Sequence, residues 1–376
     1  MRTRLILSLL IGLLYFVTGC APKVVSQSDL DTPEYHYRLG VRSLDDGDYQ
    51  TALTAFQRAV DLDRRYARGW SGLGLTQAYL NNFSEGRRSV DRGVDLASRD
   101  AVVYVFRGRF WTVNRGERNW LENAEDDFRR ALDLEPGNES AEYYLGEAYL
   151  YSYNFQQAEA QFARVVEIRG ELAGKADEMW ELTQKIVRAR PGTDAGRQIA
   201  IKSEITRADL AVLFTEELRL VEVFERMTPT GQATFQPPSA LAAAGQSVTP
   251  PDVVGTWAEP WIVEAIELGV FEADPSGNFS PEQTVTRVDY AMAVQRILVA
   301  ATRDASLETR YFGESPSRFT DVPSSHFAYN AMALCAERGI MQADLMTGRF
   351  NPAGMVNGAD ALLIIRQIQS SLRLTF

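Results

Sequence analysis

The sequence has few of the residues that build catalytic and metal sites. Among 376 residues there are two histidines and two cysteines. The histidines, His36 and His326, lie far apart in the sequence, and no HExxH, paired-cysteine or P-loop pattern is present. We therefore expect a protein that is not an enzyme and that binds no metal and no cofactor.

A surplus of basic residues is also missing. The chain has 39 lysines and arginines against 50 aspartates and glutamates, a formal net charge of −11. Nucleic-acid-binding domains usually carry a dominant basic face, which neutralises phosphates. The composition therefore argues against a nucleic-acid partner.

The amino-terminus has an apolar run that is too short to span a membrane comfortably. Arg2 and Arg4 precede an apolar stretch from Leu5 to Val17, and this arrangement is typical of an export signal. The stretch ends in "VTGC", at Cys20, which resembles the lipobox of bacterial lipoproteins. The resemblance implies a signal peptide over 1–19, a lipid attached to Cys20 and a linker over 20–32.

The lipoprotein resemblance also implies a location. Ala21 follows the cysteine, where an aspartate is the usual signal for retention in the inner membrane. We therefore expect a cell-envelope protein held by its lipid anchor, at the outer membrane and facing the periplasm. Lipidation would leave Cys335 without a disulfide partner, and its apolar surroundings predict a small core residue.

Glycines recur at nearly constant spacing through the first half of the chain. Gly40, Gly74, Gly108 and Gly146 are separated by 34, 34 and 38 residues, and a second helix-period stretch follows each of them. The period and the residue types resemble the tetratricopeptide repeat, a pair of antiparallel helices. The matching residues are these four glycines and Ala52, Phe56, Trp70, Ala124, Phe128, Leu145, Tyr149, Ala158 and Phe162.

This resemblance implies a solenoid of helical hairpins. It predicts an array of four repeats over 33–172 and a capping helix over 173–190, with the second repeat departing from the pattern at Gly86 and Val90. Stacked hairpins of this family form a concave face that binds proteins, so we expect a protein partner there.

Two stretches near the carboxy-terminus align with each other. Both begin with Asp-Val, contain a helix-period segment that ends at glycine, and continue through Gly-x-Phe-x-Pro into a second helix. They resemble the S-layer homology module. The residues that we expect to build it are Asp252, Trp257, Gly269, Phe279, Pro281, Asp321, Gly339, Phe350 and Pro352.

The module typically consists of three units in a pseudo-threefold arrangement. We assign a partial first copy to 191–226, a second copy to 252–318 and a third, degenerate copy to 319–376. A linker rich in proline, alanine and glycine over 227–251 separates the first two. The predicted fold is therefore mainly α-helical: a hairpin solenoid followed by a pseudo-trimeric α-helical repeat domain.

A short phrase recurs once in each copy. It reads "TRAD" from Thr206, "TRVD" from Thr286 and "NGAD" from Asn357. Threonine or asparagine followed three residues later by an acidic residue is the signature of a capped helix start. Capping explains the first and last residues of the phrase, but it does not explain the arginine.

Two roles remain open for Arg207 and Arg287. A guanidinium at a helix N-terminus suits an anion, and the family's arginine motif lines grooves that bind anionic cell-wall polysaccharide. On this reading Thr206, Thr286 and the two arginines are candidates for glycan binding. Alternatively, the arginines form ion pairs with acidic residues of a neighbouring copy.

The sequence thus predicts a non-enzymatic lipoprotein of the cell envelope. Its repeat array would bind a protein partner, while its carboxy-terminal module would attach to an anionic cell-wall or surface polysaccharide. The alternative is an assembly or scaffold factor of a secretion or polysaccharide-export machine, in which the module makes protein contacts only.

Overall fold

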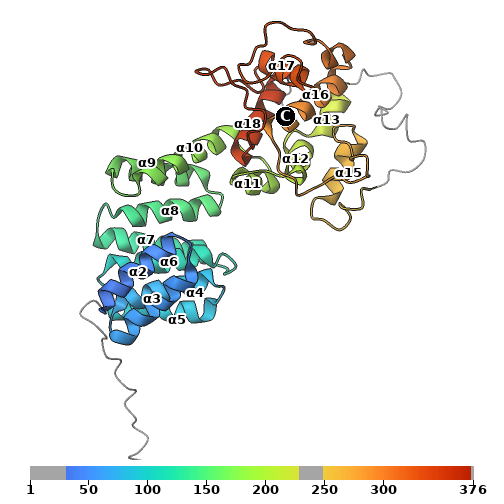
Figure 1. Ribbon diagram of the computed structural model, residues 1–376. Helices are drawn as coiled ribbons and strands as arrows, with labels where there is room; N and C mark the ends of the chain where they lie inside the picture. Colours follow the sequence, from blue (N-terminus) through green and yellow to red (C-terminus); the bar gives the residue numbers. More distant parts are fainter. Residues whose placement is uncertain (1–30, 228–248, 374–376) are drawn as a thin grey trace, which may run out of the picture. The chain divides into compact units, whose positions relative to one another are not determined.

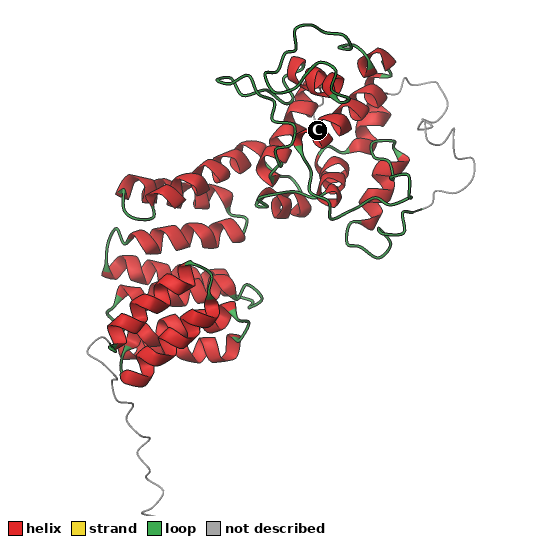
Figure 2. Ribbon diagram, viewed as in Figure 1, coloured by secondary structure: helices red, strands yellow, loops and turns green. Residues whose placement is uncertain are grey.

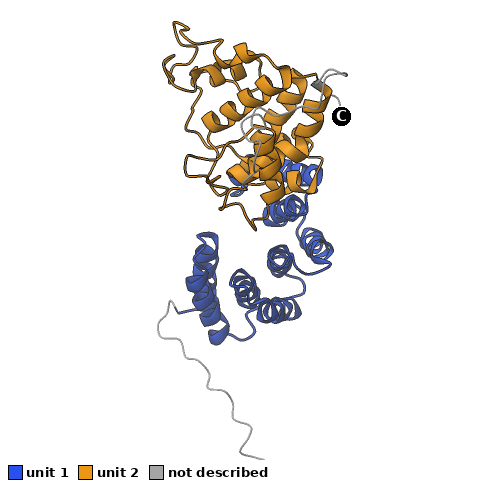
Figure 3. Cartoon of the chain, turned by 90° about the vertical axis from the view of Figure 1, so that its right-hand side faces the viewer, with its two compact units in different colours: residues 1–177 blue, residues 178–376 orange. Residues whose placement is uncertain are grey.

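The computed structural model describes residues 31–227 and 249–373 (Figure 1). Helices and loops make up this part of the chain, and its β-structure is limited to isolated bridges (Figure 2). The chain divides into two compact units, residues 1–177 and 178–376 (Figure 3). The predicted signal peptide, Cys20 and nearly all of the predicted linker over 227–251 lie outside the described residues.

The amino-terminal unit consists of consecutive helical hairpins (Figure 1). They are α2 (Pro33–Asp45) with α3 (Tyr49–Leu62), α4 (Ala67–Tyr79) with α5 (Phe83–Leu96), α6 (Ala101–Val113) with α7 (Trp120–Leu134), and α8 (Glu139–Tyr151) with α9 (Phe155–Ile168). The following helix, α10 (Ala173–Ala189), crosses the division between the two units. The predicted solenoid is confirmed.

A glycine on the first helix of a hairpin makes room for a phenylalanine on the second. An ideal Cβ at Gly40 would lie 2.7 Å from the ring of Phe56, and one at Gly108 would lie 2.7 Å from the ring of Phe128. Both rings are completely buried. This contact between a glycine and a phenylalanine of one repeat therefore closes the first and the third hairpin.

The second hairpin closes differently. Gly86 and Val90 replace the alanine and phenylalanine, and an ideal Cβ at Gly74 would lie 2.5 Å from the carbonyl oxygen of Gly86. Without a ring between them, the main chains of α4 and α5 come closer together. The departure from the repeat pattern is thus a change of packing, and the helical hairpin is retained.

The carboxy-terminal unit consists of short helices and ordered turns. Its elements after α10 are α11 (Asp194–Ala200), α12 (Arg207–Val212), the π-helix η1 (Leu213–Glu217), α13 (Leu220–Met227), α15 (Glu259–Glu267), α16 (Arg287–Thr302), the 3₁₀-helix η2 (Ala305–Glu308), α17 (Tyr329–Glu337) and α18 (Gly358–Ser371).

Three main-chain hydrogen bonds join the three copies in a ring. The N–H of Val285 donates to the carbonyl of Ile205 (2.9 Å), that of Val356 donates to Val285 (3.1 Å), and that of Ile205 donates to Val356 (2.9 Å). Each of these residues immediately precedes the recurrent phrase of its copy. The predicted pseudo-trimeric arrangement is confirmed.

Other local expectations are also met. Gly269 and Gly339 follow α15 and α17 with φ angles of 74° and 68°, which are the left-handed conformation expected at a helix end. Cys335 is fully buried in α17, as expected for a core residue, and burial raises the pKa of its thiol to about 12.

Candidate functional site

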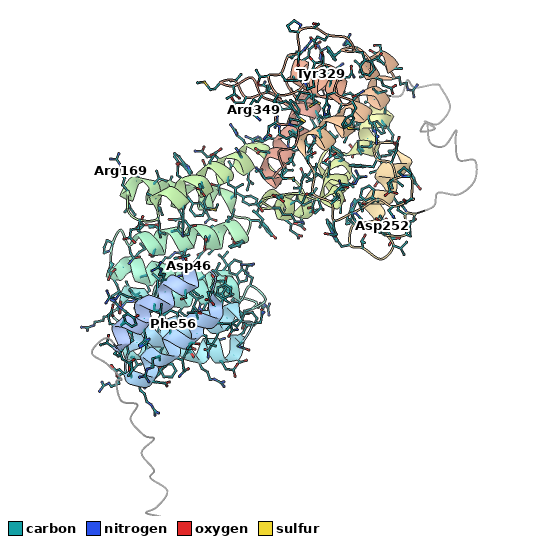
Figure 4. The ribbon with its side chains drawn as sticks, viewed as in Figure 1. Asp46, Phe56, Arg169, Asp252, Tyr329 and Arg349 are labelled. Atoms are coloured by element: carbon teal, nitrogen blue, oxygen red, sulfur yellow. The ribbon has the colours of Figure 1, made fainter. Side chains whose placement is uncertain are left out.

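The first candidate site surrounds the Gly-x-Phe-x-Pro turn of the second copy. The carboxylate of Asp252, labelled in Figure 4, accepts hydrogen bonds from the N–H groups of Phe279 (2.9 Å) and Ser280 (2.6 Å). Arg207 Nε donates to the carbonyl of Phe279 (2.9 Å), and its guanidinium lies 4.6 Å from the centre of that ring. The turn is therefore held by an aspartate of its own copy and by an arginine of the first copy.

The third copy repeats this arrangement. Asp321 accepts from the N–H groups of Phe350 and Asn351, both at 2.8 Å. Arg287 of the second copy donates from Nε to the carbonyl of Phe350 (2.8 Å) and from Nη2 to that of Gln342 (2.8 Å). We call each such set of one aspartate, one turn phenylalanine and one arginine a turn clamp.

The turn clamps change the protonation equilibria of their members. Burial alone would raise the pKa of Asp252 and Asp321, but the main-chain N–H donors outweigh it, so the pKa of each lies below its ordinary value. Burial lowers the pKa of Arg207 and Arg287. Arginine remains protonated at neutral pH even so.

The recurrent phrase caps helices as predicted. Thr206 and Asp209 form a complete capping box at α12, and Thr286 and Asp289 form one at α16. In both, the threonine hydroxyl accepts from the aspartate N–H and also donates to its carboxylate. Each threonine hydroxyl therefore uses both its donor and an acceptor lone pair within its own helix cap.

The third phrase keeps the cap with a different residue. The N–H of Asp360 donates to the side-chain oxygen of Asn357 (2.8 Å), and the amide nitrogen of Asn357 donates to the carboxylate of Asp360 (2.8 Å). Asparagine thus replaces threonine at the start of α18, as the sequence predicts.

The arginines have a role that neither sequence alternative included. Among the described residues, neither Arg207 nor Arg287 has a carboxylate within ion-pair distance, and both donate to main-chain carbonyls. In the same part of the chain, Nη1 of each guanidinium has no hydrogen-bond partner, so a donor remains for a ligand. The sequence carries no direct signal for this role, because the acceptors are main-chain carbonyls, which are present at every residue.

Exposed aromatic side chains mark equivalent places in the second and third copies. Trp257, which we expected to be structural, is 53% exposed, and Lys202 Nζ lies 5.9 Å from its ring centre. Phe327 precedes α17 as Trp257 precedes α15, and it is 73% exposed. Phe327 borders a cavity of about 300 Å³ together with Gln295 and Arg296. Sequence reasoning missed Phe327, although its alignment with Trp257 could have indicated it.

The amino-terminal unit has a candidate site of its own. A cavity of about 320 Å³ is bordered by the first helices of the second, third and fourth hairpins. Tyr144 and Tyr151 line it, although the sequence could not distinguish them from packing residues. Arg109 also lines it and was not singled out from the sequence.

Within residues 31–227 and 249–373, no group of three or more histidine, cysteine, aspartate or glutamate side chains is placed to hold a metal ion. No helix of this part of the chain has both the length and the apolarity needed to cross a bilayer.

Comparison with known proteins identifies the class of the carboxy-terminal unit. The S-layer homology domain family matches residues 251–291 and 318–362, which contain both turn clamps except for Arg207. The unit therefore contains an S-layer homology domain, and the domain associates the chain with the cell envelope or surface.

Two individual proteins are also similar to parts of the chain. An uncharacterized protein of Methanocaldococcus jannaschii is 33% identical over 61 residues, which cover 16% of this chain and 71% of that protein, and over that segment the chain belongs to the same family. A crystal structure of MamA protein matches 42% of this chain and 88% of its own, with 19% identity and a TM-score of 0.28. The assignment of a helical solenoid rests on the hairpins described above.

Proposed function

We propose that this protein is a non-enzymatic tether of the cell envelope. In this proposal the S-layer homology domain attaches to an anionic cell-wall or surface polysaccharide, and the helical hairpin array binds a protein partner. A lipid on Cys20 anchors the chain in the outer membrane, facing the periplasm.

One observation carries the glycan half of the proposal. Arg207 and Arg287 occupy equivalent places, and within the described part of the chain Nη1 of each has no hydrogen-bond partner, while the other guanidinium nitrogens donate to main-chain carbonyls. Such a nitrogen is already fixed in orientation, so the arginine side chain loses little further conformational entropy when an anionic group binds it. Thr206 and Thr286 contribute by capping the helices from which the arginines project.

Co-sedimentation with isolated cell-wall sacculi tests this proposal. The full chain should sediment with the sacculi, and Arg207→Ala combined with Arg287→Ala should abolish most of this binding. Arg310→Ala is the matched control, because Arg310 is an exposed arginine of the second copy and is not a member of either turn clamp. Circular dichroism and thermal unfolding of each variant separate loss of binding from loss of fold. Failure of the wild-type chain to sediment would refute the glycan role.

A second candidate function is favoured by a different observation. Leu345 and Met346 are 92% and 93% exposed at the tip of a turn in the third copy. The turn is ordered by Asp344, whose carboxylate accepts from the N–H groups of Met346 and Thr347. Two large apolar side chains held in solvent suit a protein contact. They support the alternative of an assembly factor whose carboxy-terminal module binds protein only.

The two functions predict different effects of the same substitutions. Leu345→Ser combined with Met346→Ser should leave sacculus binding unchanged under the tether proposal. A different outcome would favour the assembly function over the tether function: the substitutions reduce capture of envelope proteins, and neither wild type nor variant sediments with sacculi. Cys20→Ser should release the chain from membranes, and retention there would exclude the lipid anchor.

A further inference from the structure

A compact cavity lies at one end of the helical hairpins. Its volume is about 320 Å³, and three residues that line it, Tyr79, Val113 and Tyr151, are the last residues of α4, α6 and α8. Peptides are usually recognised along an extended groove or sheet edge. Cavities of roughly 300–1,000 Å³ are typical of small-molecule sites. The size of this cavity and its place at the helix ends therefore favour a compact ligand.

Tyrosine rings form the apolar part of the lining, and a stacked partner fixes their orientation. The guanidinium of Arg109 lies 4.0 Å from the ring centre of Tyr144. The ring of Tyr79 stacks on that of Tyr49, with centres 4.6 Å apart and planes inclined by 5°. One face of each ring is thus covered, and the ring is held in place before a ligand arrives. The opposite face of such a ring is electron-rich, and the C–H groups of a sugar pack well against it.

Two guanidinium groups supply the positive part of the lining. The buried Nε of Arg109 has no hydrogen-bond partner among the described residues. Arg115 lies 4.4 Å from the ring centre of Tyr151 and donates to the carbonyl of Thr112 at 2.9 Å. A guanidinium that stacks on a ring keeps the N–H groups in its own plane for acceptors. The two arginines can therefore hold an anionic group of a ligand.

The other polar groups of the lining suit a ligand with hydroxyl groups. The hydroxyls of Tyr79, Tyr144 and Tyr151 can each donate and accept, and the carboxylate of Glu147 accepts. Burial raises the pKa of Glu147, and Arg109 opposes that shift only in part. One weakened negative charge therefore faces two guanidinium groups. A ligand that matches this lining carries several hydroxyl groups and a negative charge.

We propose that this cavity binds one anionic sugar unit, a sugar ring that carries a carboxylate or a phosphate group. The arginines donate hydrogen bonds to the anionic group, and the tyrosine hydroxyls and Glu147 pair with the sugar hydroxyls. The tyrosine rings contact the C–H groups of the sugar. This site goes beyond the proposed function, because it depends neither on a glycan at Arg207 and Arg287 nor on a protein partner of the array.

Saturation-transfer difference NMR with the full chain tests the inference. The probes are methyl glucuronide, methyl glucoside phosphorylated on its primary hydroxyl, neutral methyl glucoside, and an acetylated Gly-Ala dipeptide with a free carboxylate. A ligand of this size should bind with a Kd on the order of 1 mM, which this method detects. We expect one acidic sugar to bind at least about tenfold more tightly than the neutral sugar and the dipeptide. Binding of the dipeptide as tight as that of the acidic sugars, or binding of no sugar, would overturn the proposal.

Substitutions locate the site. Arg109→Gln should weaken binding of the preferred sugar about tenfold, whereas Arg88→Gln, which removes an exposed arginine paired with Glu85 on α5, should leave it unchanged. Thermal unfolding shows whether each variant is folded. Should Arg109→Gln fail to fold, Arg115→Gln combined with Tyr151→Ser replaces it, because both side chains are exposed. Sugar binding that is insensitive to the folded variant would contradict the site.

The same probes separate this inference from the proposed function. The chain with Arg207→Ala and Arg287→Ala should bind the preferred sugar as wild type does. If this chain loses the sugar while Arg109→Gln retains it, the sugar binds to the S-layer homology domain and the cavity site is wrong. If wild type fails to sediment with sacculi but binds the sugar through Arg109, the proposed glycan role of the domain is wrong and the cavity site stands.

Discussion

The carbonyl oxygen of Ile199 lies where a side chain of residue 358 would begin. An ideal Cβ on Gly358 would be 1.7 Å from that oxygen, and the N–H of Gly358 donates to the carbonyl of Lys202 at 2.9 Å. The first copy has no Gly-x-Phe-x-Pro turn, and the end of α11 lies in this place instead. The third phrase therefore lacks arginine because it has neither room for the side chain nor a turn to hold.

Substitution at this glycine should destabilise the carboxy-terminal unit. Gly358→Ala forces the main chain of α11 away from α18, and we expect a loss of at least about 2 kcal/mol, within the range for overpacked sites. Urea unfolding followed by tryptophan fluorescence measures it. Gly174→Ala is the matched control: nothing lies within 4 Å of its ideal Cβ and it is helical, so the change should be neutral or slightly stabilising. Equal stability of Gly358→Ala and wild type would contradict the steric explanation.

The turn clamp makes a prediction about side-chain shape at constant charge. Arg287→Lys keeps the positive charge but cannot donate to the carbonyls of Phe350 and Gln342 from one planar group. We expect a loss of about 2 kcal/mol, since hydrogen bonds from charged donors contribute about 1.5–3 kcal/mol. Thermal unfolding measures this loss, and Arg310→Lys, at an exposed site outside both turn clamps, should change stability by less than about 0.5 kcal/mol. A tolerated Arg287→Lys would mean that the clamp depends on charge alone.

The sequence predicted the elements well because their signals are local. Helix caps at Thr206 and Thr286, glycine helix ends and the glycine–phenylalanine spacing of the hairpins each depend on residues close in sequence. The pseudo-threefold arrangement followed from the resemblance of three copies, and the ring of hydrogen bonds among Ile205, Val285 and Val356 confirms it.

The contacts of the candidate sites could not be predicted in the same way. Arg207 and the carbonyl of Phe279 are 72 residues apart, and main-chain carbonyls leave no mark in a sequence as acceptors. The place of Arg109 in a cavity bordered by three hairpins is equally hidden, because the residues that line the cavity lie far apart in the sequence. Sequence reasoning therefore considered ligands and carboxylates for the arginines, but not a turn.

Acid should weaken the turn clamps. Because the folded pKa of Asp252 and Asp321 lies below the unfolded value of about 3.9, their contribution is complete above that value and is lost as the pH falls through the folded pKa. Asp252→Asn with Asp321→Asn should be less stable than wild type at pH 7, and the difference should shrink below about pH 4. Urea unfolding between pH 7 and pH 3 measures this. The control Asp133→Asn, at an exposed site on α7, should follow wild type. A difference that stays constant with pH would mean that the carboxylates contribute through shape alone.

The two ways of closing a hairpin predict different tolerance of alanine. At Gly108 the nearest obstacle to a Cβ is the ring of Phe128 at 2.7 Å, which can tilt, so Gly108→Ala should cost about 1–2 kcal/mol. At Gly74 the obstacle is the carbonyl oxygen of Gly86 at 2.5 Å, which moves only if α5 moves as a whole. Gly74→Ala should therefore cost more, about 3 kcal/mol, at the upper end of the overpacking range.

Combining Gly108→Ala with Phe128→Leu should restore part of the stability, because the smaller side chain makes room for the methyl group. No such compensation is expected for Gly74→Ala with Val90→Ala, since the main chain of Gly86 still blocks the site. Thermal unfolding of the four variants measures these differences. Equal losses of stability at Gly74 and Gly108 would show that a main-chain obstacle and a ring obstacle are equally easy to displace.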